Sequence, residues 1–156
     1  VGLKSTLNIT NNQIKNRAQI KLELGDLPLV ECAPSQINQV LLNLVVNAAQ
    51  AIPDDREGLI TIRTYSDGTF ANIEVEDNGL GMSDEILQKV FDPFFTTKDP
   101  GKGTGLGLSV SQKIIQDHGG ALTVVSFVGV GSIFKITLPI RVKNANPAPS
   151  YKTENN

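Results

Sequence analysis

Residues 35–52 read SQINQVLLNLVVNAAQAI and carry the strongest helical pattern in this chain of 156 residues. At about 100° per residue, one side of this helix is an apolar arc, made of Ile37, Leu41, Leu44, Val45, Ala48 and Ile52. The other side is a stripe of five amides, Gln36, Gln39, Asn43, Asn47 and Gln50. Helix faces in water usually carry Lys and Glu. The stripe indicates a wall facing a ligand, amides bonded to a neighbouring loop, or a polar face that arose by chance. As a ligand wall it would suit a ligand that is partly cationic and partly anionic, since amide oxygens can bind magnesium and amide N–H groups can bind phosphate.

Alternating and helical segments flank this central helix, whose first turn suits Pro34. Alternation predicts strands at 18–24, 59–65, 71–76, 121–127 and 132–140, with a short strand at 29–32. Further helices are expected at 3–17, at 83–90 with Ser83 as N-cap, and at 108–118. Several strand pairs are linked too tightly for parallel crossovers. We therefore expect an α+β fold, a two-layer α/β sandwich with helices on one face of a mixed, largely antiparallel sheet.

Composition places the chain among ordinary globular proteins. It is 40% hydrophobic and 19% charged, and its net charge of −2 provides no general attraction for nucleic acid or an anionic membrane. The single cysteine, Cys32, cannot form an internal disulfide and is expected to be a small buried hydrophobe. No apolar run reaches the roughly 20 residues of a membrane span, and the first residues are too polar for a signal peptide. We expect a cytoplasmic domain over residues 1–141, followed by a disordered tail or linker over 142–156.

Residues 74–82 read EVEDNGLGM and place a carboxylate, Asp77, at the end of a predicted strand, before two glycines. A negative charge here would repel phosphate, but it could accept a hydrogen bond from an exocyclic amine such as that of adenine. Gly79 and Gly81 would let the base approach the backbone, and Met82 would supply a pliable apolar contact. The alternative is a simple β-turn without a ligand.

Residues 99–109, DPGKGTGLGLS, lead directly into a predicted helix. Backbone N–H groups of such a loop can surround an anion, the helix N-terminus favours negative charge, and Lys98 and Lys102 add positive charge. The residue order is neither that of a P-loop nor that of a dinucleotide fingerprint, and a flexible linker is the alternative. The preceding residues 91–98, FDPFFTTK, hold three phenylalanines that form either a small core of the loop or contacts of a lid.

Taken in order, these blocks resemble the catalytic, ATP-binding domain of sensor histidine kinases, which shares a Bergerat-type fold with gyrase, the mismatch-repair protein MutL and a heat-shock chaperone. QVLLNLVVNAAQAI is similar to the N box, DNGLGM to the first glycine box, FDPFFTTK to the F box and GKGTGLGLSV to the second glycine box. HGGALTVVS with GVGSIFKITLP resembles the closing hairpin. The likeness covers roughly residues 1–140.

This resemblance implies a set of nucleotide ligands. Asn47 would bind Mg²⁺, Asn43 would lie beside the phosphates, and Gln50 would make a neutral phosphate contact where many relatives have lysine. Asp77 would bind the adenine amine, with Gly79, Gly81 and Met82 shaping that pocket and Ser132 supporting the carboxylate through water. Lys98 and Lys102 would lie on the lid near the terminal phosphates and assist the reaction together with Asn43. The remaining residues implied to contact the nucleotide are Gly103, Thr104, Gly105, Leu106, Gly107 and Leu108.

The resemblance also bears on the reaction. ATP-hydrolysing relatives place a water-activating glutamate one turn before the metal-binding asparagine, whereas this chain has Asn43, which cannot act as a base. Transfer to a partner is therefore favoured. The implied acceptor is a histidine on a separate dimerisation domain, with a response regulator downstream, and the isolated domain is expected to be monomeric and to bind no nucleic acid. The single histidine, His118, is expected to be structural. A Ser/Thr kinase of the anti-sigma-factor type and a non-enzymatic nucleotide sensor are the alternatives.

Overall fold

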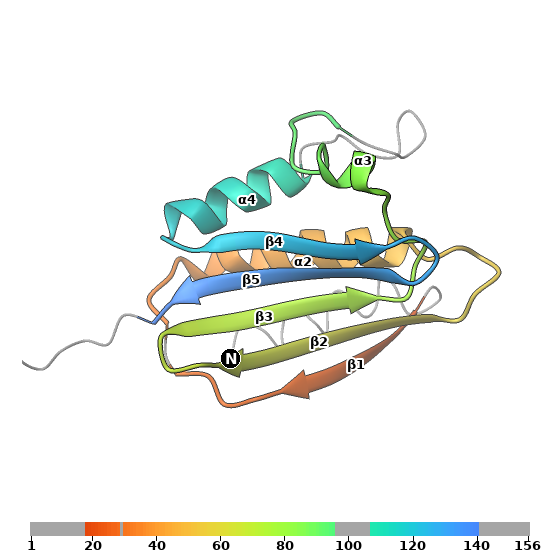
Figure 1. The fold of residues 1–156 in the computed structure, drawn as a ribbon. Coiled ribbons are helices and arrows are strands. Elements are labelled where there is room, and N and C mark those ends of the chain that lie inside the picture. Colours follow the sequence, from red (N-terminus) through yellow and green to blue (C-terminus); the bar gives the residue numbers. More distant parts are fainter. Residues whose placement is uncertain (1–17, 29, 96–106, 141–156) are drawn as a thin grey trace, which may run out of the picture.

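The computed structural model describes residues 18–28, 30–95 and 107–140, which form a sheet covered on one face by helices (Figure 1). The sheet has five strands in the order β1-β2-β3-β5-β4. The strands are β1 (Ala18–Leu24), β2 (Gly58–Ser66), β3 (Phe70–Asp77), β4 (Ala121–Phe127) and β5 (Gly131–Pro139). The helices are α2 (Pro34–Gln50), α3 (Asp84–Leu87) and α4 (Gly107–Asp117).

The sheet is mixed, as the sequence predicts. Strand β1 pairs with β2 in parallel, while the β2–β3, β3–β5 and β5–β4 pairs are antiparallel. The register brings Asp77, at the end of β3, opposite both Ile60 of β2 and Ser132 of β5. The expected α+β, largely antiparallel architecture is confirmed, and the loops that follow β3 and precede β5 meet at one end of the sheet.

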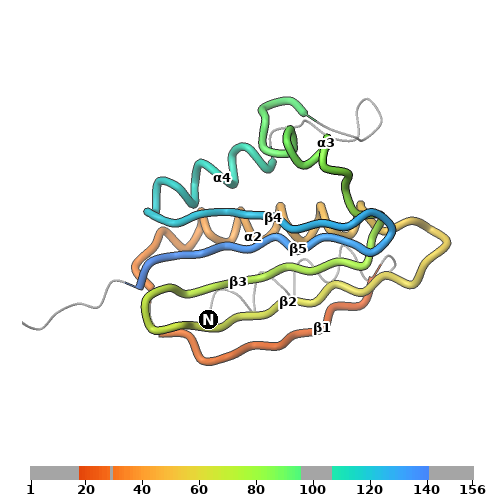
Figure 2. Tube along the Cα trace, viewed as in Figure 1, coloured from red at the N-terminus to blue at the C-terminus, as the bar shows by residue number. Residues whose placement is uncertain are grey.

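Helices α2 and α4 form the second layer (Figure 2). Helix α2 begins with Pro34 at its first position and lacks a side-chain N-cap, so its stability comes from burial. All six residues of the predicted apolar arc are buried in the core. Val40 and Ala49, which flank that arc on its two edges, are buried as well. Helix α4 packs beside α2, and its Ile115 is completely buried in the same core.

The structure differs from the prediction at element ends. Residues 30–32 form no strand, which corrects the short strand expected at 29–32, since no neighbouring strand pairs with them. Helix α3 ends at Leu87 and continues as turns through residue 92, so it is shorter than predicted. The predicted helix at 3–17, the loop residues 99–106 and the tail at 142–156 lie outside the described residues, so the domain boundary at 141 stays a prediction. Among the described residues, no helix combines the length and apolarity of a membrane span.

Candidate functional site

Asp77 is the buried acidic residue of the site, with 4% of its surface exposed. The alternation of β3 directs Ile73, Val75 and Asp77 toward the helix layer, so the carboxylate is buried with the core residues. Its Oδ1 accepts the Gly79 N–H at 2.8 Å, and the backbone N–H of Ser132, the β5 residue opposite Asp77, also favours the charged carboxylate. Burial raises the pKa of Asp77 above its ordinary value; these two N–H groups oppose that shift, and the charge of Glu76 adds to it. A carboxylate of this kind can accept one further hydrogen bond from a ligand.

The loop after Asp77 is fixed by the protein's own backbone. The Leu80 N–H donates to Ala51 O at 3.1 Å, and the Gly129 N–H donates to Leu80 O at 2.7 Å. A Cβ on Gly79 would lie 2.5 Å from Ala51 O, and one on Gly81, whose φ is +69°, would lie 2.0 Å from Phe127 O. The expected role of both glycines in admitting an adenine base stays a prediction; their close neighbours in the protein are the end of α2 and the end of β4.

A buried hydroxyl pair stands between β4 and β5 beside this loop. Ser126 Oγ accepts the Met82 N–H at 2.8 Å, donates to Gly131 O at 3.1 Å, and lies 2.7 Å from Ser132 Oγ. A hydroxyl has one proton to donate, and Ser126 donates its proton to Gly131 O. Ser132 Oγ is therefore the donor, and Ser126 Oγ the acceptor, in the bond between the two serines. The β3–β5 register sets Ser132 opposite Asp77, and its support of the carboxylate through water stays a prediction. Ser126 is a residue that the sequence analysis did not single out.

Two residues with side-chain bonds in or next to this loop were not predicted. Arg56, between α2 and β2, donates from Nη1 to the carbonyl oxygens of Asn78 and Gly79 at 2.7 and 3.0 Å, and more weakly to Gly129 O at 3.4 Å. The Asn78 side chain accepts the Leu59 N–H at 2.8 Å and donates to Glu57 O at 2.9 Å. Their partners are backbone groups, which leave no side-chain pattern in a sequence; the only available signal was an arginine directly after the central helix.

The other end of the candidate site lies between α2 and α4. Asn43 Nδ2 donates to the fully buried Ser111 Oγ at 3.2 Å. Gly107, the first residue of α4, is next to Asn43, since a Cβ added there would lie 3.9 Å from Asn43 Cγ. The α4 N-terminus, which favours anions, therefore adjoins the amide stripe. Asn47 follows one turn along α2 and is half-buried, while Gln50 is exposed at its end.

The predicted residues thus fall into two groups. The first group is Asn43 and Gly107, which adjoin each other where α2 meets α4. The second group lies in or beside the loop after β3 and consists of Asp77, Gly79, Gly81, Met82 and Ser132. Leu108 packs against the edge of the core. The remaining predicted contacts lie outside the described residues, namely Lys98, Lys102, Gly103, Thr104, Gly105 and Leu106.

Three residues outside the two groups also have defined surroundings. Phe91, of the phenylalanine-rich stretch, packs edge-on against Phe134 of the main core, with ring centroids 6.4 Å apart. Cys32 packs partly buried at the core edge. His118 accepts the Ala33 N–H on Nε2 at 3.1 Å, and its Nδ1 lies 2.7 Å from Ile114 O. With both ring nitrogens bonded to backbone, His118 ties the end of α4 to the start of α2, in keeping with its expected structural role.

A two-layer sandwich with a buried carboxylate behind a glycine loop and amides facing a helix N-terminus is the arrangement of an ATP-binding domain. Residues 32–142 match the family described as histidine kinase-, DNA gyrase B- and HSP90-like ATPases, and the chain belongs to this family.

Its relatives confirm the resemblance to sensor kinases. The chain is 39% identical over 141 residues to sporulation kinase E of Bacillus subtilis (strain 168), covering 89% of this chain and 19% of that protein. It is 50% identical over 106 residues to the signal transduction histidine-protein kinase AtoS of Escherichia coli (strain K12), covering 67% and 17%. The catalytic domain of the histidine kinase ThkA, in a nucleotide-free form, superposes with a TM-score of 0.76 at 33% identity, covering 88% of this chain and 91% of that one. The chain spans less than a fifth of the length of these two curated relatives.

Proposed function

We propose that this chain binds ATP with Mg²⁺ and donates the γ-phosphate to a histidine on a separate dimerisation and phosphoacceptor domain, as the catalytic domain of a two-component sensor histidine kinase. Membership of the ATPase family and the likeness to several sensor kinases support ATP binding and this direction of transfer. The whole protein would work in the cytoplasm and signal to a response regulator, and the isolated domain would be monomeric.

The donor set suits the proposed ligand. Asp77, buried and already bonded to the Gly79 N–H, would accept a hydrogen bond from the exocyclic amine of adenine. Its direct partners are neutral and Glu76 adds negative charge nearby, which suits a base better than a phosphate. At the other end, the α4 N-terminus at Gly107 would face the phosphates, and the Asn47 amide oxygen would bind Mg²⁺. Bound Mg²⁺ would neutralise phosphate charge during transfer.

Asn43 is the single observation that carries the choice of transfer over hydrolysis. Its side chain is an amide that donates to the buried Ser111 hydroxyl, so it can neither abstract a proton from water nor swing freely away from α4. A residue in this position can orient phosphate, and phosphoryl transfer depends mainly on such positioning and on charge stabilisation. The lid residues Lys98 and Lys102 would complete the phosphate contacts.

The test supplies the acceptor separately. The chain, ATP and Mg²⁺ are incubated with a separately expressed, histidine-bearing dimerisation domain, and acid-labile phosphate on that domain is measured. We expect labelling of the added domain that is lost in Asn47→Asp and Asp77→Asn, with no phosphate on His118. Rapid release of inorganic phosphate by the chain alone, with no labelled acceptor, would identify a hydrolase instead.

A further inference from the structure

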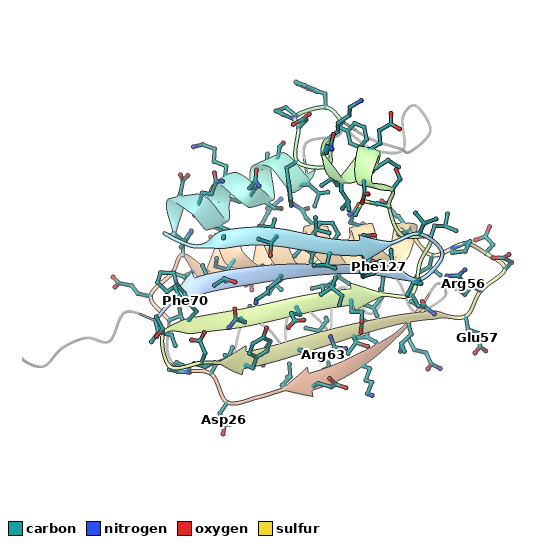
Figure 3. All side chains as sticks on the ribbon, viewed as in Figure 1. Asp26, Arg56, Glu57, Arg63, Phe70 and Phe127 are labelled. Carbon is teal, nitrogen blue, oxygen red and sulfur yellow. The ribbon has the colours of Figure 1, made fainter. Side chains whose placement is uncertain are left out.

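The loop that follows Asp77 is bound by one cationic side chain, that of Arg56. Arg56 Nη1 contacts the carbonyl oxygens of Asn78, Gly79 and Gly129, which come from the loop after β3 and from the β4–β5 turn. Figure 3 shows Arg56 at the end of the sheet where this turn lies, near the labelled Phe127. Three carbonyl oxygens that converge on one point repel one another, and a cation between them relieves that repulsion.

The shortest of these contacts belongs to the peptide unit between Asn78 and Gly79. Its carbonyl oxygen accepts from Arg56 at 2.7 Å, and its N–H donates to Asp77 Oδ1 at 2.8 Å. One rigid peptide plane therefore joins the guanidinium to the carboxylate. A cation on the carbonyl side polarises the peptide and strengthens the N–H donor on its other side.

Backbone bonds hold the two flanking peptides, from the Asn78 N–H to Leu59 O at 3.3 Å and from the Leu80 N–H to Ala51 O at 3.1 Å. The carbonyl of the Asn78–Gly79 peptide itself is bonded by the Arg56 side chain. The Asn78 side chain binds Leu59 N–H and Glu57 O, which positions the strand ends rather than the Asn78 carbonyl. Gly79, on the far side of the plane, has no side chain to restrict a rotation of the peptide. A rotated plane would turn the Gly79 N–H away from Asp77 and a carbonyl oxygen toward it.

We propose that Arg56 is a positioning residue for base recognition, which holds the Asn78–Gly79 peptide so that Asp77 presents its carboxylate to the exocyclic amine of adenine. This inference rests on the proposed function, because it takes Asp77 as the adenine contact. Arg56 itself touches no nucleotide; it acts through the peptide and the carboxylate.

The test compares ATP with purine riboside triphosphate, which lacks only the exocyclic amine, by calorimetric binding to the 156-residue chain in the presence of Mg²⁺. The native chain is expected to prefer ATP by roughly tenfold or more, the value of one hydrogen bond to a charged group. Arg56→Ala should reduce this preference to less than about threefold. Arg56→Lys should restore most of it, since an ammonium can also donate to three carbonyl oxygens.

A matched arginine on the same sheet provides the control. Arg63 of β2 forms ion pairs with Glu23 and Glu76 at 2.9 and 2.6 Å, and these bonds direct its guanidinium to the strands rather than to the loop. Arg63→Ala should keep the native preference for ATP. The Gly79 amide proton gives a second measurement: its NMR resonance should move upfield in Arg56→Ala, as its bond to Asp77 weakens, and stay in place in Arg63→Ala.

The outcomes separate the two claims. If the native chain does not distinguish the two nucleotides, the assignment of Asp77 to adenine is wrong, and the role of Arg56 is wrong with it. If the native chain prefers ATP and Arg56→Ala keeps that preference while only its unfolding midpoint falls, Arg56 is a structural residue and the proposed function stands. Should Arg56→Ala not fold, the neutral Arg56→Gln decides by the same ratio.

Discussion

Replacing Asp77 with asparagine exchanges one carboxylate oxygen for an NH2 group and removes the buried charge. It tests most directly whether this carboxylate binds the adenine amine. The amide oxygen of the new side chain can still accept the Gly79 N–H that the carboxylate accepts at Oδ1. Its NH2 group, however, would face the adenine amine as a second donor. A hydrogen bond to a charged group contributes about 1.5–3 kcal/mol, so the Kd for ATP·Mg should rise roughly 10- to 100-fold.

The same substitution should not weaken the fold. The pKa of Asp77 is raised in the folded chain, mainly by burial, so the folded state binds a proton more readily than the unfolded state does. The buried charge of Asp77 therefore lowers the free energy of unfolding at neutral pH. This loss becomes smaller as the pH falls from the raised pKa of the folded state to the pKa of the unfolded state. Asp77→Asn removes that loss, so urea unfolding at neutral pH should show a variant at least as stable as the native chain. That advantage should shrink as the pH approaches the ordinary pKa of an aspartate, about 4.

Glu76→Gln is the matched control, because it makes the same change one residue earlier, where Glu76 forms an ion pair with Arg63 at 2.6 Å. Such a partly exposed pair contributes about 0–1 kcal/mol, and ATP binding should be unchanged. The reasoning is refuted if Asp77→Asn binds ATP as the native chain does. It is equally refuted if that variant is less stable than Glu76→Gln at neutral pH. Native affinity for ATP should also decline as the pH falls through the raised pKa.

Three further predictions concern residues that support the site. Gly81→Ala should lower the free energy of unfolding by about 2–4 kcal/mol, since the new Cβ would lie 2.0 Å from Phe127 O and the backbone is left-handed there. The control Gly68→Ala, with φ +90° and no neighbour within 4 Å, should lower it by about 1 kcal/mol. Equal losses in urea unfolding would contradict this difference. Ser111→Ala should release Asn43 and raise the Kd for ATP·Mg about fivefold in calorimetry, from the loss of about 1 kcal/mol; an unchanged Kd would show that this bond does not order the site. His118→Ala should lower the free energy of unfolding by about 1–3 kcal/mol, because the Ala33 N–H loses its acceptor, and a chain that loses no stability would remove the proposed structural role.

Periodicity was sufficient for much of this protein. The apolar arc of residues 35–52 predicted a helix with one buried side, and all six of its members are buried. Alternation predicted all five strands of the sheet within two residues, since side chains on a strand face opposite sides regardless of the partner strand. The position of Asp77 at a strand end, before two glycines, was also visible in the sequence. These features are local, and local features can be read along a chain.

The pairing of strands and the contacts between helices were decided only by the tertiary structure. The parallel match of β1 with β2 joins segments that are separated by the whole of α2, and residues 30–32 stay irregular because no strand reaches them. The contact between Asn43 of α2 and Ser111 of α4 joins two helices that lie far apart in the chain, and the pattern of neither helix predicts it.

The amide stripe, Asp77 and the glycine loop after it were determined by the sequence itself, because residue type and spacing set their chemistry and local structure. The tertiary structure decided what those groups touch: Gly79 and Gly81 are packed against Ala51 and Phe127, and Arg56 is joined to Asp77 through one peptide plane. Backbone carbonyl and N–H groups are the same at every residue, so a sequence carries no mark of which of them a side chain will bind.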